Sequence, residues 1–197
     1  MAKIANTREG LAKKAVMLGR LVPDMAEGAI ESVFHLIKDS ETLSYSLKGV
    51  IKKESDVAPK MLLEYILIYL HLIDRIAVEC LPAEQRYEFQ GGLVRWVIKE
   101  SQKVYKEKFK NAEAYHGLLS SNFEDAFGDL YNERQREYSE YVKLIAGPGE
   151  AAGGTLFWDF GKRIGSILGH TDVITVMGAQ GAAVQGVTFL NTKDLLQ

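Results

Sequence analysis

One apolar segment of the sequence, Met61 to Leu81, carries the residues best suited to chemistry. Glu64, His71 and Asp74 stand in it among leucines, isoleucines and tyrosines. His71 and Asp74 are three residues apart, so on a helix they share one face. Such a pair can hold a metal ion, or it can act as a general base with its orienting carboxylate. Glu64 lies on nearly the same side of the helix, about 10.5 Å away along the axis.

An earlier helical segment offers Glu31 and His35, which are four residues apart. If the two segments are antiparallel neighbours, Glu31 and His35 face His71 and Asp74 across the bundle. Together with Glu64, these residues form the candidate metal site. The same side chains are also consistent with a ligand pocket, or with a buried network of ion pairs and hydrogen bonds that fixes helix register. We favour the buried network.

The composition predicts one globular domain over residues 1–197. The chain is 47% hydrophobic and 25% charged, and a core of that size needs no cross-links. Its single cysteine, Cys80, cannot form an internal disulfide, and we expect it to be a small buried hydrophobic residue. This cysteine usage fits a reducing compartment, so the sequence predicts a cytoplasmic location.

The charge pattern argues against nucleic acid and membrane partners. The formal net charge is −2, so no global field attracts polyanions. The lysine-rich stretch 99–110 and the basic residues of the first twenty positions, including Lys14, are interpreted as solvated helix faces. The central segment is too polar at its middle to cross a bilayer, and we expect no integral membrane span.

Helical periodicity dominates the first half of the chain. We expect a partly ordered N-terminal helix over residues 1–20 and a second helix that opens at Pro23 and continues to about residue 53. The central helix should carry Pro59 in its first turn, where a missing N–H is tolerated. Pro82 ends that helix and begins the next, because proline disfavours helical geometry in the residue before it.

The second half continues the helical pattern after a connection over residues 111–120. Ser121 and Glu124 have capping-box spacing and open a fifth helix. Tyr138 and Val142 of that helix are expected inward or at an edge, and its opposite face, which includes Arg134, is expected to be solvated.

A sixth helix is predicted to follow the glycine-rich loop that starts near Gly147. Thr155 is placed to cap this helix, and Gly169 is placed to end it.

The C-terminal tail, residues 171–197, is the second unusual feature. The eighteen residues from Val173 to Leu190 contain no charge, and glycines recur at four-residue spacing from Gly161. Glycines so spaced let another backbone approach closely. We expect this segment to be a helix or a glycine-broken hairpin, packed on the bundle or on a second copy.

The predicted fold is therefore an all-α bundle of six or seven helices. The leading functional hypothesis is a non-catalytic binding or interaction module that self-associates as a homodimer or larger homo-oligomer, with another protein as a further partner. One alternative is a metal-binding helical bundle, which would include a metal-dependent enzyme. The other is peripheral membrane association through the tail. No motif identifies a substrate or a cofactor.

Overall fold

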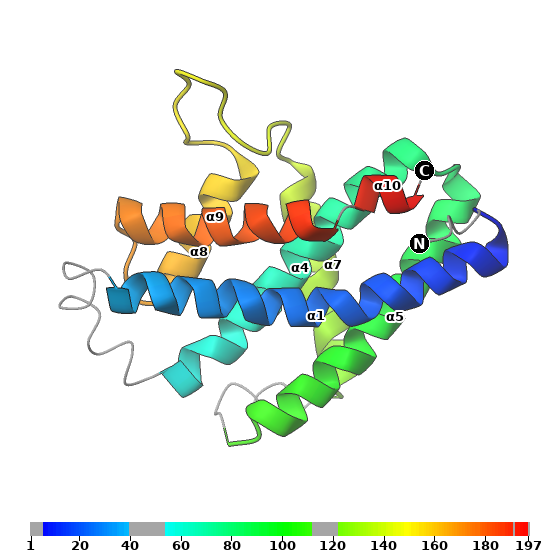
Figure 1. Ribbon diagram of the computed structural model, residues 1–197, viewed down its shortest axis with the longest axis horizontal. Coiled ribbons are helices and arrows are strands. Elements are labelled where there is room, and N and C mark those ends of the chain that lie inside the picture. The colour runs from blue at the N-terminus through cyan, green and yellow to red at the C-terminus, as the bar shows by residue number, and fades with distance from the viewer. Residues whose placement is uncertain (1–5, 40–53, 112–121, 191, 197) are drawn as a thin grey trace.

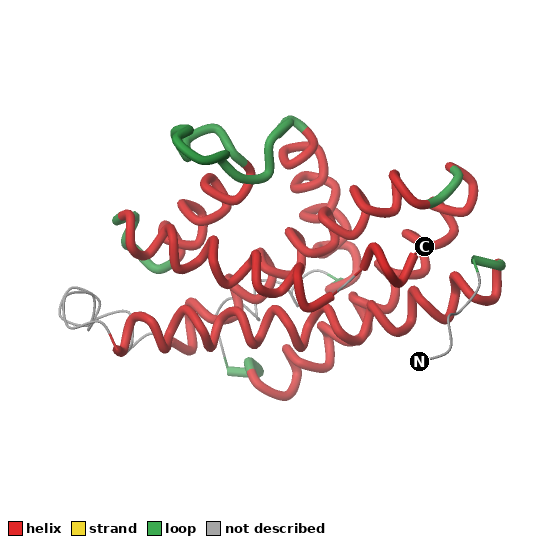
Figure 2. The backbone as a smooth tube through the Cα atoms, turned by 45° about the horizontal axis from the view of Figure 1, so that its top comes forward, coloured by secondary structure: helices red, strands yellow, loops and turns green. Residues whose placement is uncertain are grey.

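The computed structural model describes residues 6–39, 54–111, 122–190 and 192–196, which form seven α-helices and no strand (Figures 1 and 2). The predicted all-α bundle is confirmed. The predicted helix over residues 40–53, Ser121 and nearly all of the 111–120 connection lie outside these ranges. The helices are α1 (Arg8–Asp39), α4 (Glu54–Cys80), α5 (Ala83–Lys108), α7 (Phe123–Ser139), α8 (Leu156–Ile167), α9 (Val173–Leu190) and α10 (Thr192–Leu196).

The central helix α4 is surrounded by other helices. Every residue from Met61 to Ile73 is buried, and α1, α5, α7, α8 and α9 all pack on α4. A helix that is apolar all round is stable only in such an enclosed position. The helix begins at Glu54, so Pro59 lies in its second turn rather than in its first. The Tyr105 hydroxyl of α5 donates to the Pro59 carbonyl and fixes this turn against α5.

The predicted helix boundary at Pro23 is wrong, because α1 runs without interruption through it. An interior proline costs a helix about 3 kcal/mol relative to alanine. Burial of Val22 and Pro23 and the long contacts of α1 with α5 and α9 offset that cost. The residue four positions before the proline, Gly19, lies so close to Trp96 of α5 that a side chain there would collide with it.

Lys14 is buried, which corrects the prediction that it is solvated. Its ammonium donates to Asn6 Oδ1 at 2.5 Å, and Asn6 Nδ2 donates to the Leu196 carbonyl of α10 at 2.6 Å. The start of α1 is thereby tied to α10.

The uncharged tail segment forms the helix α9, which lies antiparallel to α1 (Figure 1). Tyr65 and Tyr69 of α4 hold it by donating to the carbonyls of Ala179 at 3.1 Å and Ala182 at 3.4 Å. Gly186 makes this contact feasible, because a side chain there would overlap the Tyr69 hydroxyl. The bundle therefore covers one face of α9, and Val173, Ile174 and Met177 on the other face are exposed.

Asp172 fixes the start of α9. Its carboxylate accepts from the Ile174 and Thr175 backbone N–H groups at 2.9 and 3.0 Å, and it also contacts His170 Nδ1 at 2.6 Å. Desolvation raises the pKa of this carboxyl, but the hydrogen bonds from Thr175, His170 and Ile174 outweigh it and lower the pKa to about 2. These bonds satisfy N–H groups that a helix start leaves unpaired.

Two predicted helix caps change in detail. Asn122 caps α7, with its side chain accepting from Glu124 N at 3.3 Å, in the place expected for Ser121. Thr155 precedes α8 as predicted, but its hydroxyl donates to the Ala152 carbonyl instead of capping the helix. Gly169 ends α8 as expected, because its φ of 74° favours glycine.

No helix among the described ranges is both long enough and apolar enough to cross a membrane.

Candidate functional site

Two polar side chains lie inside the otherwise apolar wall of α4. Glu64 is 7% exposed and His71 is 4% exposed, and both face α7. A buried polar group without a partner costs about 1–3 kcal/mol, and a buried charge costs more. The partners that α7 supplies to these two residues define the candidate site.

Arg134 of α7 neutralises Glu64. Its Nε lies 3.1 and 3.0 Å from the two carboxylate oxygens of Glu64, and one terminal nitrogen lies 2.8 Å from Oε1. The Tyr138 hydroxyl donates to Oε2 of the same carboxylate at 3.2 Å. A forked guanidinium–carboxylate pair of this kind combines strong hydrogen bonds with a fixed orientation.

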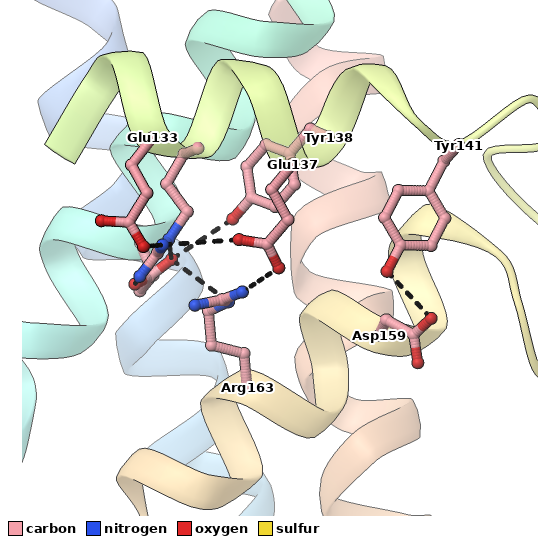
Figure 3. Close-up of polar contacts among 8 residues, drawn as sticks. Glu133, Glu137, Tyr138, Tyr141, Asp159 and Arg163 are labelled. Atoms are coloured by element: carbon pink, nitrogen blue, oxygen red, sulfur yellow. Dashed lines mark hydrogen bonds and ion pairs between the residues drawn. The ribbon is translucent and has the colours of Figure 1, made fainter.

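Further charged side chains contact this pair, and Figure 3 labels three of them, Glu133, Glu137 and Arg163. Arg163 of α8 points at Glu137 of α7 and forms an ion pair with it, while its Nε lies 3.7 Å from Glu64. Glu133 and Glu137 also contact the Arg134 guanidinium, at 2.9 and 3.4 Å. The network therefore joins α4, α7 and α8 through alternating charges.

The electrostatics of the network keep Arg134 ionised. Desolvation lowers the pKa of this guanidinium, but the hydrogen bond and the charge of Glu64 raise it well above its ordinary value. Burial, followed by the negative charge of Glu64, raises the pKa of Tyr138, so this phenol stays protonated and acts as a donor. All of the network's groups are partnered, and this arrangement suits a structural role.

His71 makes a different kind of contact, two helical turns along α4. Its Nδ1 lies 2.9 Å from Oε1 of Gln135, and its ring packs edge-on against Tyr138. Nε2 of His71 and Nε2 of Gln135 are buried and have no hydrogen-bond partner within the described part of the chain. Burial lowers the pKa of His71 despite the opposing effect of its hydrogen bond to Gln135, so the neutral imidazole is favoured at pH 7.

A surface pocket of about 620 Å³ lies at His71, between α4, α7 and the segment that follows α7. We call it the His71 pocket. Arg75 donates to the Tyr141 carbonyl at 2.9 Å, and Asp74 is paired with Arg86 of α5 at 3.3 Å. The lining residues are His71, Asp74, Arg75, Val78, Gln135, Arg136, Ser139, Tyr141 and Val142.

The structure separates the residues of the predicted site. His71 is buried and reaches Gln135 of α7, whereas Asp74 is partly exposed and pairs with Arg86 of α5. Glu31 and His35 are exposed on α1, and the His35 ring lies 3.7 Å from Asp39 of its own helix, so they do not face His71 and Asp74. In the ranges that the structure describes, no three His, Cys, Asp or Glu side chains gather into a group that could hold a metal ion.

Sequence reasoning missed the most important partners on α7. Arg134, predicted to be solvated, is 8% exposed, whereas Val142, predicted inward or at an edge, is 89% exposed. Arg134 lies seven residues after Phe127 and four before Tyr138, so it belongs to the buried stripe of its helix. That spacing, together with a buried glutamate that requires a cation, was the available signal.

No protein-family model, no curated protein and no solved structure matches this chain. Its function therefore has to be argued from the geometry of its own residues.

We predict that Glu64 and Arg134 are strongly coupled. Arg134→Met or Glu64→Leu alone leaves a buried charge poorly compensated and should lower the free energy of unfolding by about 3–5 kcal/mol. The double variant should recover much of that loss, and urea denaturation of all four proteins measures the coupling. Additive losses in the double variant would show that the pair does not act as a unit. The exposed Lys13–Glu9 pair, with atoms 2.6 Å apart, is the control and should show no coupling.

We predict that His71 makes stability depend on pH. Its pKa in the folded protein lies below the ordinary value of 6.5, so the unfolded chain binds the proton more readily. The contribution of neutral His71 to the free energy of unfolding should be fully present above the pKa of the unfolded chain. It should be lost as the pH falls below that value. His71→Asn should show a shallower loss than wild type in urea titrations from about pH 7.5 to 5.5. His35→Asn, at an exposed site, is the control, and equal slopes in all three proteins would refute the assignment.

Proposed function

We propose that the protein is a non-catalytic binding module whose ligand occupies the His71 pocket. The observation that supports the proposal is the buried His71–Gln135 pair, which leaves two polar atoms without partners beside a pocket. Buried polar atoms in native proteins nearly always find hydrogen bonds, so an unsatisfied pair beside a pocket favours a binding site. The fully partnered Glu64 network next to it acts as the rigid support.

The pair presents one donor and one acceptor whichever way its protons are arranged. If His71 Nδ1–H donates to Gln135 Oε1, the free His71 Nε2 accepts and the free amide nitrogen donates. If the Gln135 amide is turned over, the roles of both free atoms exchange. A hydroxyl, amide or protonated carboxyl group matches either arrangement, because each combines a donor with an acceptor.

The remaining lining residues favour a small ligand with negative charge and a short apolar part. Arg136 is exposed and makes no side-chain hydrogen bond or ion pair with any residue that the structure describes. Arg75 adds a second positive charge, whereas the charge of Asp74 is already offset by Arg86. Val78 and Val142 supply exposed apolar surface beside these groups. Small hydroxy acids and amide-containing acids fit this chemistry.

We predict that a panel of small hydroxy acids and amide-containing acids yields binders in saturation-transfer NMR. Val142→Trp should abolish their signals, because a large ring at this exposed position occupies the pocket without entering the core. Ile145→Trp is the matched control, since Ile145 is also exposed but does not line the pocket. An absence of binding to wild type, or equal binding to the Val142 variant, would contradict the proposal.

Self-association is the second candidate function, and the outer face of α9 supports it. Leu36 of α1 and Val173, Ile174 and Met177 of α9 are exposed and apolar, and together we call them the α9 patch. Gly181 continues this face and has nothing within 4 Å of the position a Cβ would take. A helical glycine costs about 1 kcal/mol relative to alanine, so an uncovered one favours a contact outside the chain. A symmetric pair of α9 patches would cover both copies.

We predict that light scattering on the full chain gives a dimer mass and that Met177→Lys lowers it toward the monomer mass. Gly181→Leu should weaken the dimer by keeping the helices apart while leaving the fold intact. Gly178→Leu is unsuitable as a test, because Gly178 abuts Leu36 within the same chain. Val142→Lys, at an exposed apolar position outside the patch, should leave the mass unchanged. A monomeric wild-type chain would show that the patch does not mediate self-association.

The α9 patch is also the surface that a protein partner or a membrane would bind. A monomer mass in light scattering would favour these two alternatives.

The single cysteine, Cys80, supports a cytoplasmic location as part of the proposal.

A further inference from the structure

A groove between α1 and α5 lies away from the His71 pocket. It has a volume of about 460 Å³, and small residues of both helices, Ala12, Ala15, Gly91 and Gly92, form much of its surface. Tyr87 and Trp96 of α5 add aromatic surface to it, and Arg95 adds a charge. The groove thus combines small residues, aromatic side chains and a cation.

Gly91 is the unusual residue of this groove. It is exposed within a long helix, and nothing lies within 4 Å of the position its Cβ would take. Its neighbour Gly92 has a packing reason, because a Cβ there would lie 3.4 Å from Ala15. Gly91 has no such packing reason, although a glycine inside a helix costs about 1 kcal/mol of stability relative to alanine. Gly91 therefore leaves helix backbone bare in the groove, with no packing contact in the described fold that requires it.

Tyr87, Gly91 and Arg95 stand at four-residue intervals, so they follow one another along a single face of α5. The exposed helix backbone at Gly91 therefore lies between an aromatic ring and a guanidinium. Tyr87 is 71% exposed, and the Arg86 guanidinium carbon lies 5.5 Å from its ring centre, so one face of the ring is open to contact. A flat group can approach the helix closely at Gly91, because no side chain stands in its way.

The charges around the groove favour an anion. Arg95 is exposed and forms no hydrogen bond or ion pair with the described residues, whereas Arg8 is already paired with Glu88 at 3.2 Å. Arg20 and Lys99 lie over the Trp96 ring, with charged atoms 5.4 and 4.4 Å from its centre. Arg95 is thus the cation available to a ligand, and two further cations raise the local positive potential.

We propose that this groove binds a planar aromatic anion, an aryl carboxylate or aryl sulfonate. Its ring lies against the bare backbone at Gly91 and contacts Tyr87, and its anionic group pairs with Arg95. An aliphatic acid would leave the aromatic surface unused, and a neutral ring would leave Arg95 unpaired. The site is independent of the His71 pocket, which lies on α4 and α7.

The probe is 8-anilinonaphthalene-1-sulfonate, an aromatic sulfonate, titrated into the full chain. The chain has two tryptophans, and Trp158→Phe leaves Trp96 as the only one. We expect saturable binding, seen as quenching of Trp96 emission and a rise in probe emission. Gly91→Leu should abolish it by filling the slot, and Arg95→Gln should weaken it about tenfold, the effect of losing one charge-assisted hydrogen bond.

The controls separate this groove from other apolar surfaces. Leucine is a good helix former, so circular dichroism should show that Gly91→Leu melts no lower than the parent protein. Gly28→Leu, at another exposed helical glycine with open space around it, should leave binding unchanged. N-phenyl-1-naphthylamine, which has the same rings but no sulfonate, should bind about tenfold more weakly and should not respond to Arg95→Gln.

Several results would overturn the proposal. Absence of saturable binding, or binding that persists in Gly91→Leu, would show that the groove takes no aromatic anion. Equal affinity for the neutral probe would show that Arg95 does not select for charge.

Discussion

Glu64 carries a carboxylate into the interior of the central helix, and the packing of three helices follows from the need to neutralise it. Desolvating a carboxylate is costly unless a cation and further donors meet it in good geometry. Arg134 provides the cation and Tyr138 a donor, while Arg163 extends the network to α8. Because these contacts are directional, they fix the rotation and the register of α7 against α4 more tightly than apolar contacts alone could do.

The contacts of α4 with α9 and with α7 use different chemistry. Toward α9 the contact is close and almost free of charge, with tyrosine hydroxyls donating to helix carbonyls and glycine leaving room for them. Toward α7 the contact is polar, and His71 lies where the polar seam meets the surface. The rigid ion pair beneath it keeps Gln135 in place, because Arg134 and Gln135 are consecutive residues of one helix. The polar groups of the Glu64 network and those that line the His71 pocket thus share one seam.

The sequence allowed the helices and the buried character of α4 to be predicted, since helical periodicity and apolar runs are local signals. The helix boundary predicted at Pro23 was wrong, because the packing of α1 outweighs the local cost of the proline. No local sequence pattern reveals that packing. The rotation of α1 follows from a local signal: its apolar stripe of Ile30, Val33, Phe34 and Ile37 turns inward. Glu31 and His35 stand off that stripe and lie in solvent. Arg134 and Gln135 are ordinary helix-surface residues by type, and only the pairing of α7 with α4 gives them their roles.

The tie between the start of α1 and the last helix bears on how the chain folds. During synthesis α1 emerges before α5 and α9, the helices that cover its apolar stripe, and its Lys14–Asn6 anchor closes only when the Leu196 carbonyl is present. Contacts so distant along the chain form late, because closing the intervening loop costs entropy. The part of the α1 stripe that packs on α9 therefore stays uncovered until α9 has been synthesised, and until then it is open to chaperones or to a neighbouring nascent chain.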